Sequence, residues 1–175
     1  REGTTYYTFR LGEIWGLVLD CGEDKEDDHE EYGGTVCCHA FRQRQTDYIR
    51  QVIANAAQEY AAEGVKHRVV VVHQPFTFVH RLRDPFSIEH ELFQKWADLL
   101  RENVAPDVMI CGHTHVLELE YPGCERDAMG HPCPIVVGSN PEPHRYWGAG
   151  YTFAPDGIRV QFTCSDGTCC DEVSL

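Results

Sequence analysis

The feature of this chain that most constrains its fold is an alternation of short apolar runs with longer segments of helical periodicity. Apolar residues dominate 13–20, and they then recur every three or four positions through 47–63, as on one face of a helix. Residues 68–73 contain four consecutive valines, a second helical pattern follows Ser87, and 107–111 is apolar again. This order predicts parallel strands joined by helical crossovers, and therefore an α/β fold.

After Gly112 the pattern changes to short strands without helices between them. With one strand that precedes the first apolar run, the additional predicted strands are 6–11, 116–121, 134–137, 150–153 and 158–163. Asp156-Gly157, between the last two, is typical of a tight hairpin turn. We therefore expect a layered α/β unit with a mixed sheet that is finished by antiparallel strands.

The charge of the chain limits what it can bind. Its 175 residues are enough for one domain, and they carry a net charge of -13. A field of this sign repels polyanions and no basic stripe offsets it, so the sequence argues against a nucleic-acid-binding protein. No run of about eighteen apolar residues is present, so we expect no membrane-spanning segment. The acid-rich segment 21–34 is interpreted as a solvated loop in preference to a calcium site.

The cysteines favour a reducing compartment. There are nine of them, an odd number without any Cys-x-x-Cys pair, whereas a secreted disulfide scaffold is usually smaller and evenly counted. Cys111 ends an apolar run, where a buried free thiol is the ordinary explanation. We expect a cytoplasmic protein. An alternative is that the later cysteines hold a zinc ion or form disulfides; these are Cys124, Cys133, Cys164, Cys169 and Cys170.

Histidines follow two of the apolar runs. His73 comes directly after the valines, and Gly112 is followed by His113 and His115. The carboxyl ends of parallel strands meet at one edge of a sheet, where open α/β proteins build their sites. Imidazole is the commonest neutral ligand of first-row divalent metals, so three histidines at this edge predict a metal site.

These segments, Val-Val-Val-Val-His73-Gln-Pro and Val-Met-Ile-Cys-Gly112-His113-Thr-His115, resemble the last two motifs of the calcineurin-like metallophosphoesterases. The opening Tyr-Tyr-Thr-Phe-Arg-Leu-Gly and Ile-Trp-Gly-Leu-Val-Leu-Asp-Cys resembles the stretch that follows that family's Gly-Asn-His motif. The resemblance implies part of a four-layer α/β/β/α sandwich with a dinuclear metal centre. His73 and His113 would then bind one metal ion, and His115 the other.

The family's earlier motifs Gly-Asp-x-x-Asp and Gly-Asn-His do not occur here, the one Asp-x-His tripeptide lies at 27–29 in the acid-rich loop and does not follow a predicted strand, and Asp20 matches none of these motifs. The bridging aspartate and the histidine that protonates the leaving group are therefore missing. We expect residues 1–175 to be the C-terminal half of a single metallophosphoesterase domain, inactive by itself. Its exposed half-core would favour self-association.

The resemblance implies a hydrolase, a phosphatase or phosphodiesterase acting on a small phosphate ester or a phosphoprotein. Two divalent ions, Mn, Fe or Zn, would activate a hydroxide in the full-length protein. Two alternatives stay open. One is a non-catalytic metal-binding or interaction module that reuses the fold. The other is a mononuclear zinc hydrolase, which would need a nearby carboxylate ligand.

Two loops near the predicted edge carry candidates for substrate binding. His80, Arg81 and Arg83 follow His73, where a substrate phosphate could be met. A later loop rich in turn residues contributes Asn140, His144 and Arg145. The alternative for both loops is that these side chains simply face solvent.

Overall fold

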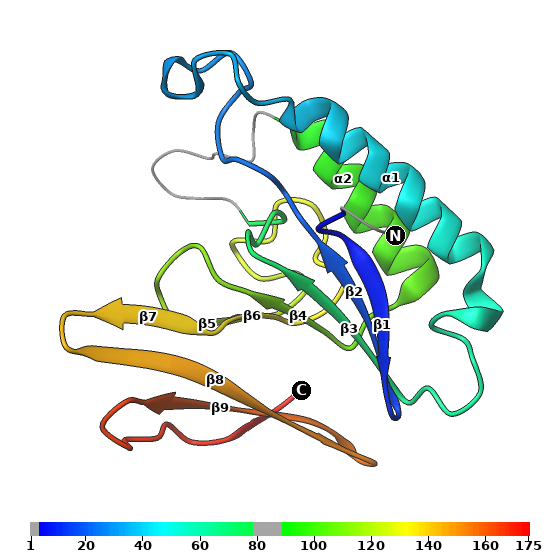
Figure 1. The fold of residues 1–175 in the computed structure, drawn as a ribbon. Coiled ribbons are helices and arrows are strands. Elements are labelled where there is room, and N and C mark those ends of the chain that lie inside the picture. Colours follow the sequence, from blue (N-terminus) through cyan, green and yellow to red (C-terminus); the bar gives the residue numbers. More distant parts are fainter. Residues whose placement is uncertain (1–3, 79–88) are drawn as a thin grey trace.

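The computed structural model describes residues 4–78 and 89–175, which form three layers (Figure 1). In this part of the chain, helices cover one face of a six-stranded sheet, and a four-stranded sheet packs against its other face. The predicted α/β class is confirmed, and the layers correspond to an α/β/β part of the implied sandwich.

The six-stranded sheet is mixed, as predicted. Its order is β1-β2-β3-β4-β6-β5, with β2, β3, β4 and β6 parallel to one another and an antiparallel strand at each edge. The strands are β1 (Tyr7–Leu11), β2 (Ile14–Leu19), β3 (His67–Val72), β4 (Val108–Cys111), β5 (Glu118–Glu120) and β6 (Ile135–Val137). The parallel core of the sheet brings the ends of β3, β4 and β6 to one edge.

The second sheet is antiparallel and takes most of the C-terminal strands. Its members are β7 (Ser139–Glu142), β8 (Arg145–Ala154), β9 (Gly157–Cys164) and β10 (Val173–Ser174). The predicted hairpin joins β8 and β9, but Ala154 pairs with Gly157, so Pro155 and Asp156 form the turn. The turn therefore begins one residue before the predicted Asp156-Gly157.

The first helix begins earlier than its apolar periodicity indicates. α1 spans Cys38–Ala54, whereas the pattern predicts 47–63. The carboxylate of Asp27 accepts hydrogen bonds from the backbone N–H of Cys38 (2.8 Å) and His39 (3.2 Å), which have no partner within the helix. Because this cap comes from outside the helix and is folded back onto it, a local pattern could not reveal it.

α1 also ends before the predicted boundary, although the apolar pattern continues. The side-chain amide of Asn55 donates to the Gln51 carbonyl at 2.8 Å, and the chain tightens into the 3₁₀ turn η2 (Ala56–Gln58). Tyr60 nevertheless stays buried against Trp15, with ring centroids 5.5 Å apart. The periodicity thus marks the buried side of the segment correctly and the end of the helix wrongly.

The second helix anchors an aromatic cluster between the helices and the sheet. α2 (His90–Leu99) continues into the wider turn η4 (Leu100–Val104). Phe76, after β3, lies 5.4 Å from the ring of Phe93 and 5.6 Å from that of Trp96. Ser87, after which the sequence predicts this helix, lies outside the described residues.

The valine side chains of β3 pack into two hydrophobic cores, one on each face of the sheet. Val70 and Val72 pack toward the helices, whereas Val69 packs against the second sheet with Ile158 and Val160. A strand covered on both faces is apolar throughout, which explains the unbroken valine run.

The cysteines and helices of the structure test the predictions about disulfides, a buried thiol and membrane-spanning segments. All nine cysteines lie in the described part of the chain and are free, so the disulfide alternative is wrong, and Cys111 is a buried thiol as predicted. None of the helices in the described ranges is long and apolar enough to cross a membrane.

Candidate functional site

The sheet topology brings the predicted site segments to one edge. Register pairs Val71 with Ile110 and Cys111 with Val137, so β3, β4 and β6 end side by side. The backbone ladder continues past the strand ends: the Gly112 N–H donates to the His73 carbonyl at 2.9 Å, and the Gly138 N–H donates to the Cys111 carbonyl at 3.1 Å. His73 and the segment after Gly112 are therefore held next to each other by main-chain bonds.

The side chains of His73 and His113 converge at this edge. Their ring centroids are 5.3 Å apart and the rings are nearly perpendicular, at 85°. Gly112 leaves the space for this approach, because a Cβ atom there would lie 3.3 Å from His73 Nδ1 and 3.7 Å from Ser139 Oγ. The structure thus brings together the two histidines that the resemblance assigns to one metal ion.

The backbone between Gly112 and Val116 is strained. His113 and His115 both adopt left-handed conformations, with φ of 70° and 57°. Such a conformation costs a residue other than glycine about 1 kcal/mol or more, and it is concentrated at functional sites. The turn is held by Thr114, whose N–H donates to the Gly112 carbonyl at 2.8 Å and whose Oγ1 lies 3.3 Å from Glu118 Oε2.

His115 does not join the converging pair in a three-ligand cluster. Within residues 4–78 and 89–175, no group of three or more histidine, cysteine, aspartate or glutamate side chains is arranged to hold a metal ion. The left-handed residues at positions 113 and 115 turn the backbone sharply between the two histidines. The assignment of His115 as a ligand of a second metal ion stays a prediction.

The substrate-binding candidates fall into two groups. His80, Arg81 and Arg83 lie outside the described residues. Asn140 lies on β7 directly after Ser139, which approaches Gly112, so it is near the edge.

His144 and Arg145 lie at the far turn of the β7–β8 hairpin. His144 is left-handed with φ of 63°. Arg145 Nε donates to Cys164 Sγ at 3.0 Å and lies 3.2 Å from Asp166 Oδ2, which ties the guanidinium to the end of β9. Contact of these two side chains with a substrate stays a prediction.

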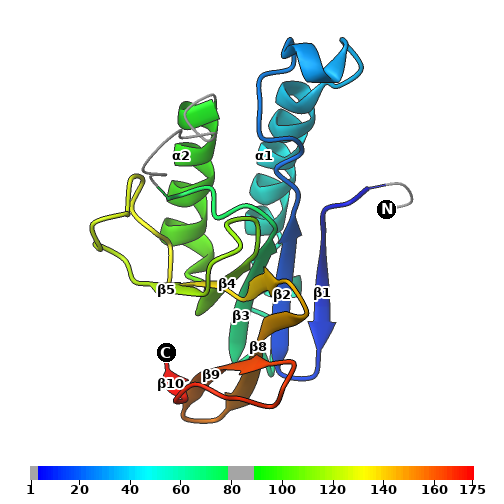
Figure 2. The ribbon, with the colours of Figure 1, turned by 90° about the vertical axis from the view of Figure 1, so that its left-hand side faces the viewer.

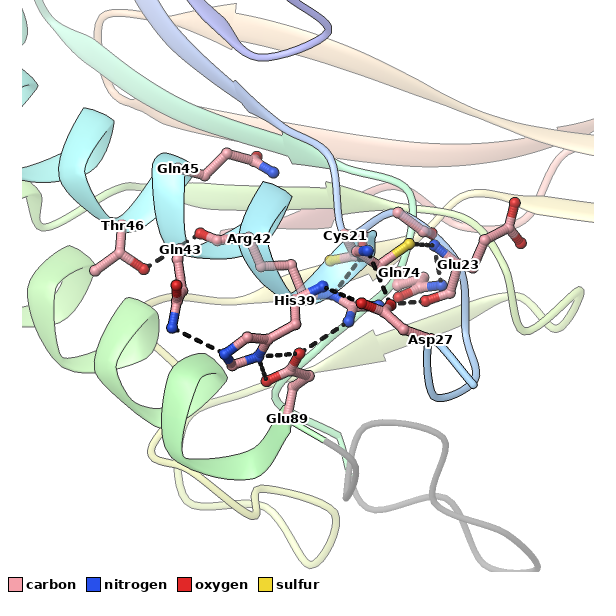
Figure 3. A network of polar contacts seen from close by, with 12 residues as sticks. Cys21, Glu23, Asp27, His39, Arg42, Gln43, Gln45, Thr46, Gln74 and Glu89 are labelled. Carbon is pink, nitrogen blue, oxygen red and sulfur yellow. Dashed lines mark hydrogen bonds and ion pairs between the residues drawn. The ribbon is translucent and has the colours of Figure 1, made fainter. Parts of the chain in front are cut away.

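A buried arginine at the helical side of the same edge was missed by sequence reasoning (Figure 3). Arg42 is 1% exposed and donates to the carbonyl groups of Cys21 (2.7 Å) and Glu23 (2.5 Å) and to Glu89 Oε1 (3.1 Å). Glu89 also lies 2.8 Å from His39 Nδ1. Arg42 therefore joins α1, the residue before α2 and the loop after β2.

This network opens onto a groove of about 840 Å³ between α1 and α2. Its polar lining includes His39, Gln43, Glu89 and Lys95. No sequence signal marks it, because an arginine or a histidine on an amphipathic helix is ordinarily a solvated residue.

Comparison with known proteins supports the fold. No known family profile matches the chain, and no curated protein is similar to it in sequence. Its structure is similar to that of a purple acid phosphatase from yellow lupin (Lupinus luteus) seeds, with a TM-score of 0.53 and 14% identity. The match covers 95% of this chain and 32% of the length of that phosphatase. At this identity the likeness concerns the fold, a mixed α/β sheet joined to an antiparallel one.

Proposed function

We propose that this chain belongs to a metal-dependent phosphoesterase that hydrolyses phosphomonoesters or phosphodiesters. The observation that carries the proposal is the convergence of His73 and His113, with ring centroids 5.3 Å apart, at the carboxyl edge of β3 and β4. The fold similarity to a phosphatase supports it. The substrate would be a small phosphate ester or a phosphoprotein.

The residues fit part of a metal site. Two imidazole side chains at one edge suit Mn, Fe or Zn as ligands, and the missing side chain of Gly112 leaves room beside the His73 ring. Zinc and manganese sites need about four to six ligands, and the described residues bring together only the two histidines. The other ligands would have to come from outside the described part of the chain.

The roles of the chain's own residues follow from this arrangement. His73 and His113 would hold one divalent ion, and His115 would contribute to a second one. When bound, a pair of divalent ions would supply an activated hydroxide and offset the negative charge that develops on the phosphate oxygens. We expect the chain by itself to bind metal weakly and to be inactive, because a two-histidine site leaves most coordination positions to water.

One observation favours a second candidate, a non-catalytic module that binds metal or a partner. Among residues 4–78 and 89–175, no three histidine, cysteine, aspartate or glutamate side chains are arranged to hold a metal ion together. A module of this kind would use the same two histidines without turnover.

Metal binding and hydrolysis, measured together, test both candidates. Titration calorimetry with Zn²⁺ and Mn²⁺ would compare the native chain with His113→Ala and with a control at the exposed His90, His90→Ala. Loss of a residue that hydrogen-bonds a metal ligand typically weakens metal binding by roughly tenfold or more. Loss of the ligand itself, in His113→Ala, should weaken it at least as much. Hydrolysis of an aryl phosphomonoester and the matching diester would be followed in this chain and in any longer protein that contains it.

The outcomes separate the candidates. Binding that depends on His113 but not on His90, with hydrolysis in a longer protein, supports the enzyme. Metal binding without hydrolysis in either protein favours the module. Equal binding by native chain and His113→Ala sinks the assignment of the metal site.

A further inference from the structure

A second cluster of reactive side chains lies in residues 121–134, the segment between β5 and β6. This segment packs against α2 and η4: Gln94 Nε2, from α2, donates to the Met129 carbonyl at 2.9 Å, and Arg101 Nη1, from η4, donates to the Gly130 carbonyl at 2.8 Å. Figure 2 shows it in yellow beside α2. Its position is therefore fixed by a helix, although it contains no regular element itself.

Three side chains of this segment form a chain of contacts. Cys124 Sγ lies 3.7 Å from His131 Nε2, and His131 Nδ1 lies 3.2 Å from Asp127 Oδ1. The His131 side chain is fully buried, whereas Cys124 is half-buried. A thiol, an imidazole and a carboxylate in this order are the parts of an activated nucleophile.

The carboxylate is held in place by the backbone. Asp127 Oδ2 accepts from the Gly123 N–H and Oδ1 accepts from the His131 N–H, both at 2.8 Å. Burial alone would raise the pKa of Asp127, but these backbone donors and the nearby His131 together bring it below its usual value. Asp127 is therefore ionised at neutral pH.

The ionised carboxylate determines which ring nitrogen carries the proton. Burial lowers the pKa of His131, and Asp127 and Glu120 only partly oppose this, while Arg126 adds to it. The imidazole is thus neutral near pH 7. His131 Nδ1 makes no well-aligned hydrogen bond in the described residues, so Asp127 acts on it through charge, favouring Nδ1–H. The Nε2 lone pair then faces Cys124.

The thiol itself is protonated at rest. Burial raises the pKa of Cys124, and Glu120 adds to the effect. Arg126, whose guanidinium lies 4.6 Å from the centre of the Phe78 ring, forms ion pairs with Glu118 and Glu120. Its charge therefore does not bring the pKa of Cys124 back to the usual value. Cys124 therefore needs a base at the moment of reaction, and His131 is placed to be that base.

We propose that Cys124 is a nucleophilic modification site for soft carbon electrophiles of the α,β-unsaturated carbonyl type, with His131 as its base and Asp127 as the positioning residue. In the reaction the Sγ electron pair forms a bond to the β-carbon of the alkene. The thiol proton passes to His131 Nε2, and the displaced π electrons take it up at the α-carbon. One thioether forms, no atom leaves, and no oxidant or reductant is required. The site is independent of the proposed phosphoesterase activity.

Labelling kinetics test this proposal. The native chain would be treated with acrylamide at pH 7 and each cysteine followed by peptide mass spectrometry, with the exposed Cys169 as an internal reference. General-base assistance should make Cys124 react roughly tenfold faster than Cys169. In His131→Gln, which keeps an amide near the Nε2 position but no base, the rate at Cys124 should fall to that of Cys169 or below. In Asp127→Asn the rate at Cys124 should lie between that of the native chain and that of His131→Gln.

A control for folding is built into the same measurement. Five thiols are buried in the native chain and should stay unlabelled in a folded variant; they are Cys21, Cys38, Cys111, Cys133 and Cys164. Where these stay protected, an unchanged rate at Cys124 in His131→Gln overturns the proposal. So does a native Cys124 that reacts no faster than Cys169.

If the substitution unfolds the chain, the pH profile of the native protein decides. An unassisted thiol below its pKa loses about a factor of ten in rate per pH unit, because only the thiolate reacts. The thiol–imidazole pair loses rate only when His131 becomes protonated, so Cys124 should stay nearly constant from about pH 8 to 6.5. A tenfold decline in the rate at Cys124 per pH unit, as for an unassisted thiol, overturns the proposal.

Discussion

The two histidine-containing regions of this molecule are built by different means. At the carboxyl edge of the six-stranded sheet, the backbone ladder and a left-handed turn place His73 beside His113. In residues 121–134, contacts with Cys124 and Asp127 place His131 inside a folded loop. The first arrangement follows from sheet topology, whereas the second depends on one buried carboxylate.

The difference has chemical consequences. Two imidazoles that converge can share a metal ion, because an imidazole ring nitrogen can donate a lone pair to it. An imidazole with a carboxylate on one side and a thiol on the other can instead move a proton. The same residue type is thus expected to be a ligand in one region and a base in the other.

Removing Arg42 should disturb the edge region most strongly. Arg42→Ala leaves Glu89 and two carbonyl groups without their buried donor, so unfolding free energy should fall by about 3–5 kcal/mol in urea denaturation. Arg50→Ala is the matched control on the same helix, since Arg50 forms an exposed pair with Asp47 and should change stability by less than about 1 kcal/mol.

The same variant tests whether the two regions are separate. In conditions where Arg42→Ala remains folded, the labelling rate of Cys124 should stay at its native value. A changed rate at Cys124, or a loss of stability no greater than in Arg50→Ala, would contradict this division of the molecule.

Removing Asp127 should act on the other region. Asp127→Ala leaves the backbone N–H groups of Gly123 and His131 unsatisfied, and we expect a loss of about 1–3 kcal/mol. Asp156→Ala, which removes an exposed partner of Arg159, is the control and should cost less than about 1 kcal/mol. Zn²⁺ binding by Asp127→Ala, measured by calorimetry, should equal that of the native chain. Weakened binding would show that the regions are coupled.

Sequence reasoning succeeded where the information is local. The valine run of β3 reports burial on both faces, and a strand followed by histidine places that residue at the sheet edge whatever the details of packing. The α/β class and the neighbouring positions of His73 and His113 could therefore be predicted.

The features that were missed depend on partners far apart in the chain. Arg42 is fixed by carbonyl groups of a loop and by Glu89, and α1 begins at Cys38 because Asp27 folds back onto it. Neither partner follows a periodic pattern. The cluster around His131 is short-range in sequence, but its chemistry arises from the burial of His131, whose ring lies 5.4 Å from that of Phe78. A pattern in residues 121–134 does not report that contact.

A smaller effect is expected from filling the space beside His73. In Gly112→Ala the new Cβ would lie 3.3 Å from His73 Nδ1, so the ring must shift by a few tenths of an ångström, with a cost of about 1 kcal/mol. Gly148→Ala is the control, because no atom lies within 4 Å of its Cβ position. Chemical shifts of the His73 ring should change only in Gly112→Ala, and its Zn²⁺ affinity should fall. Identical spectra would mean that the close approach does not position the ring.

The smallest effect concerns protonation of His131. Since burial lowers its pKa in the folded state, the unfolded chain binds a proton at this position first as pH falls below about 6.5. The contribution of His131 to the unfolding free energy is therefore fully present above that pH. It declines as the pH falls further, until the pKa of His131 in the folded state is reached. His131→Gln lacks this titration, so the difference in unfolding free energy between native chain and variant should shrink from pH 7.5 to pH 5 in urea titrations. A difference that stays constant over this range would mean that His131 is not held neutral by burial, and the base assigned to Cys124 would lose its support.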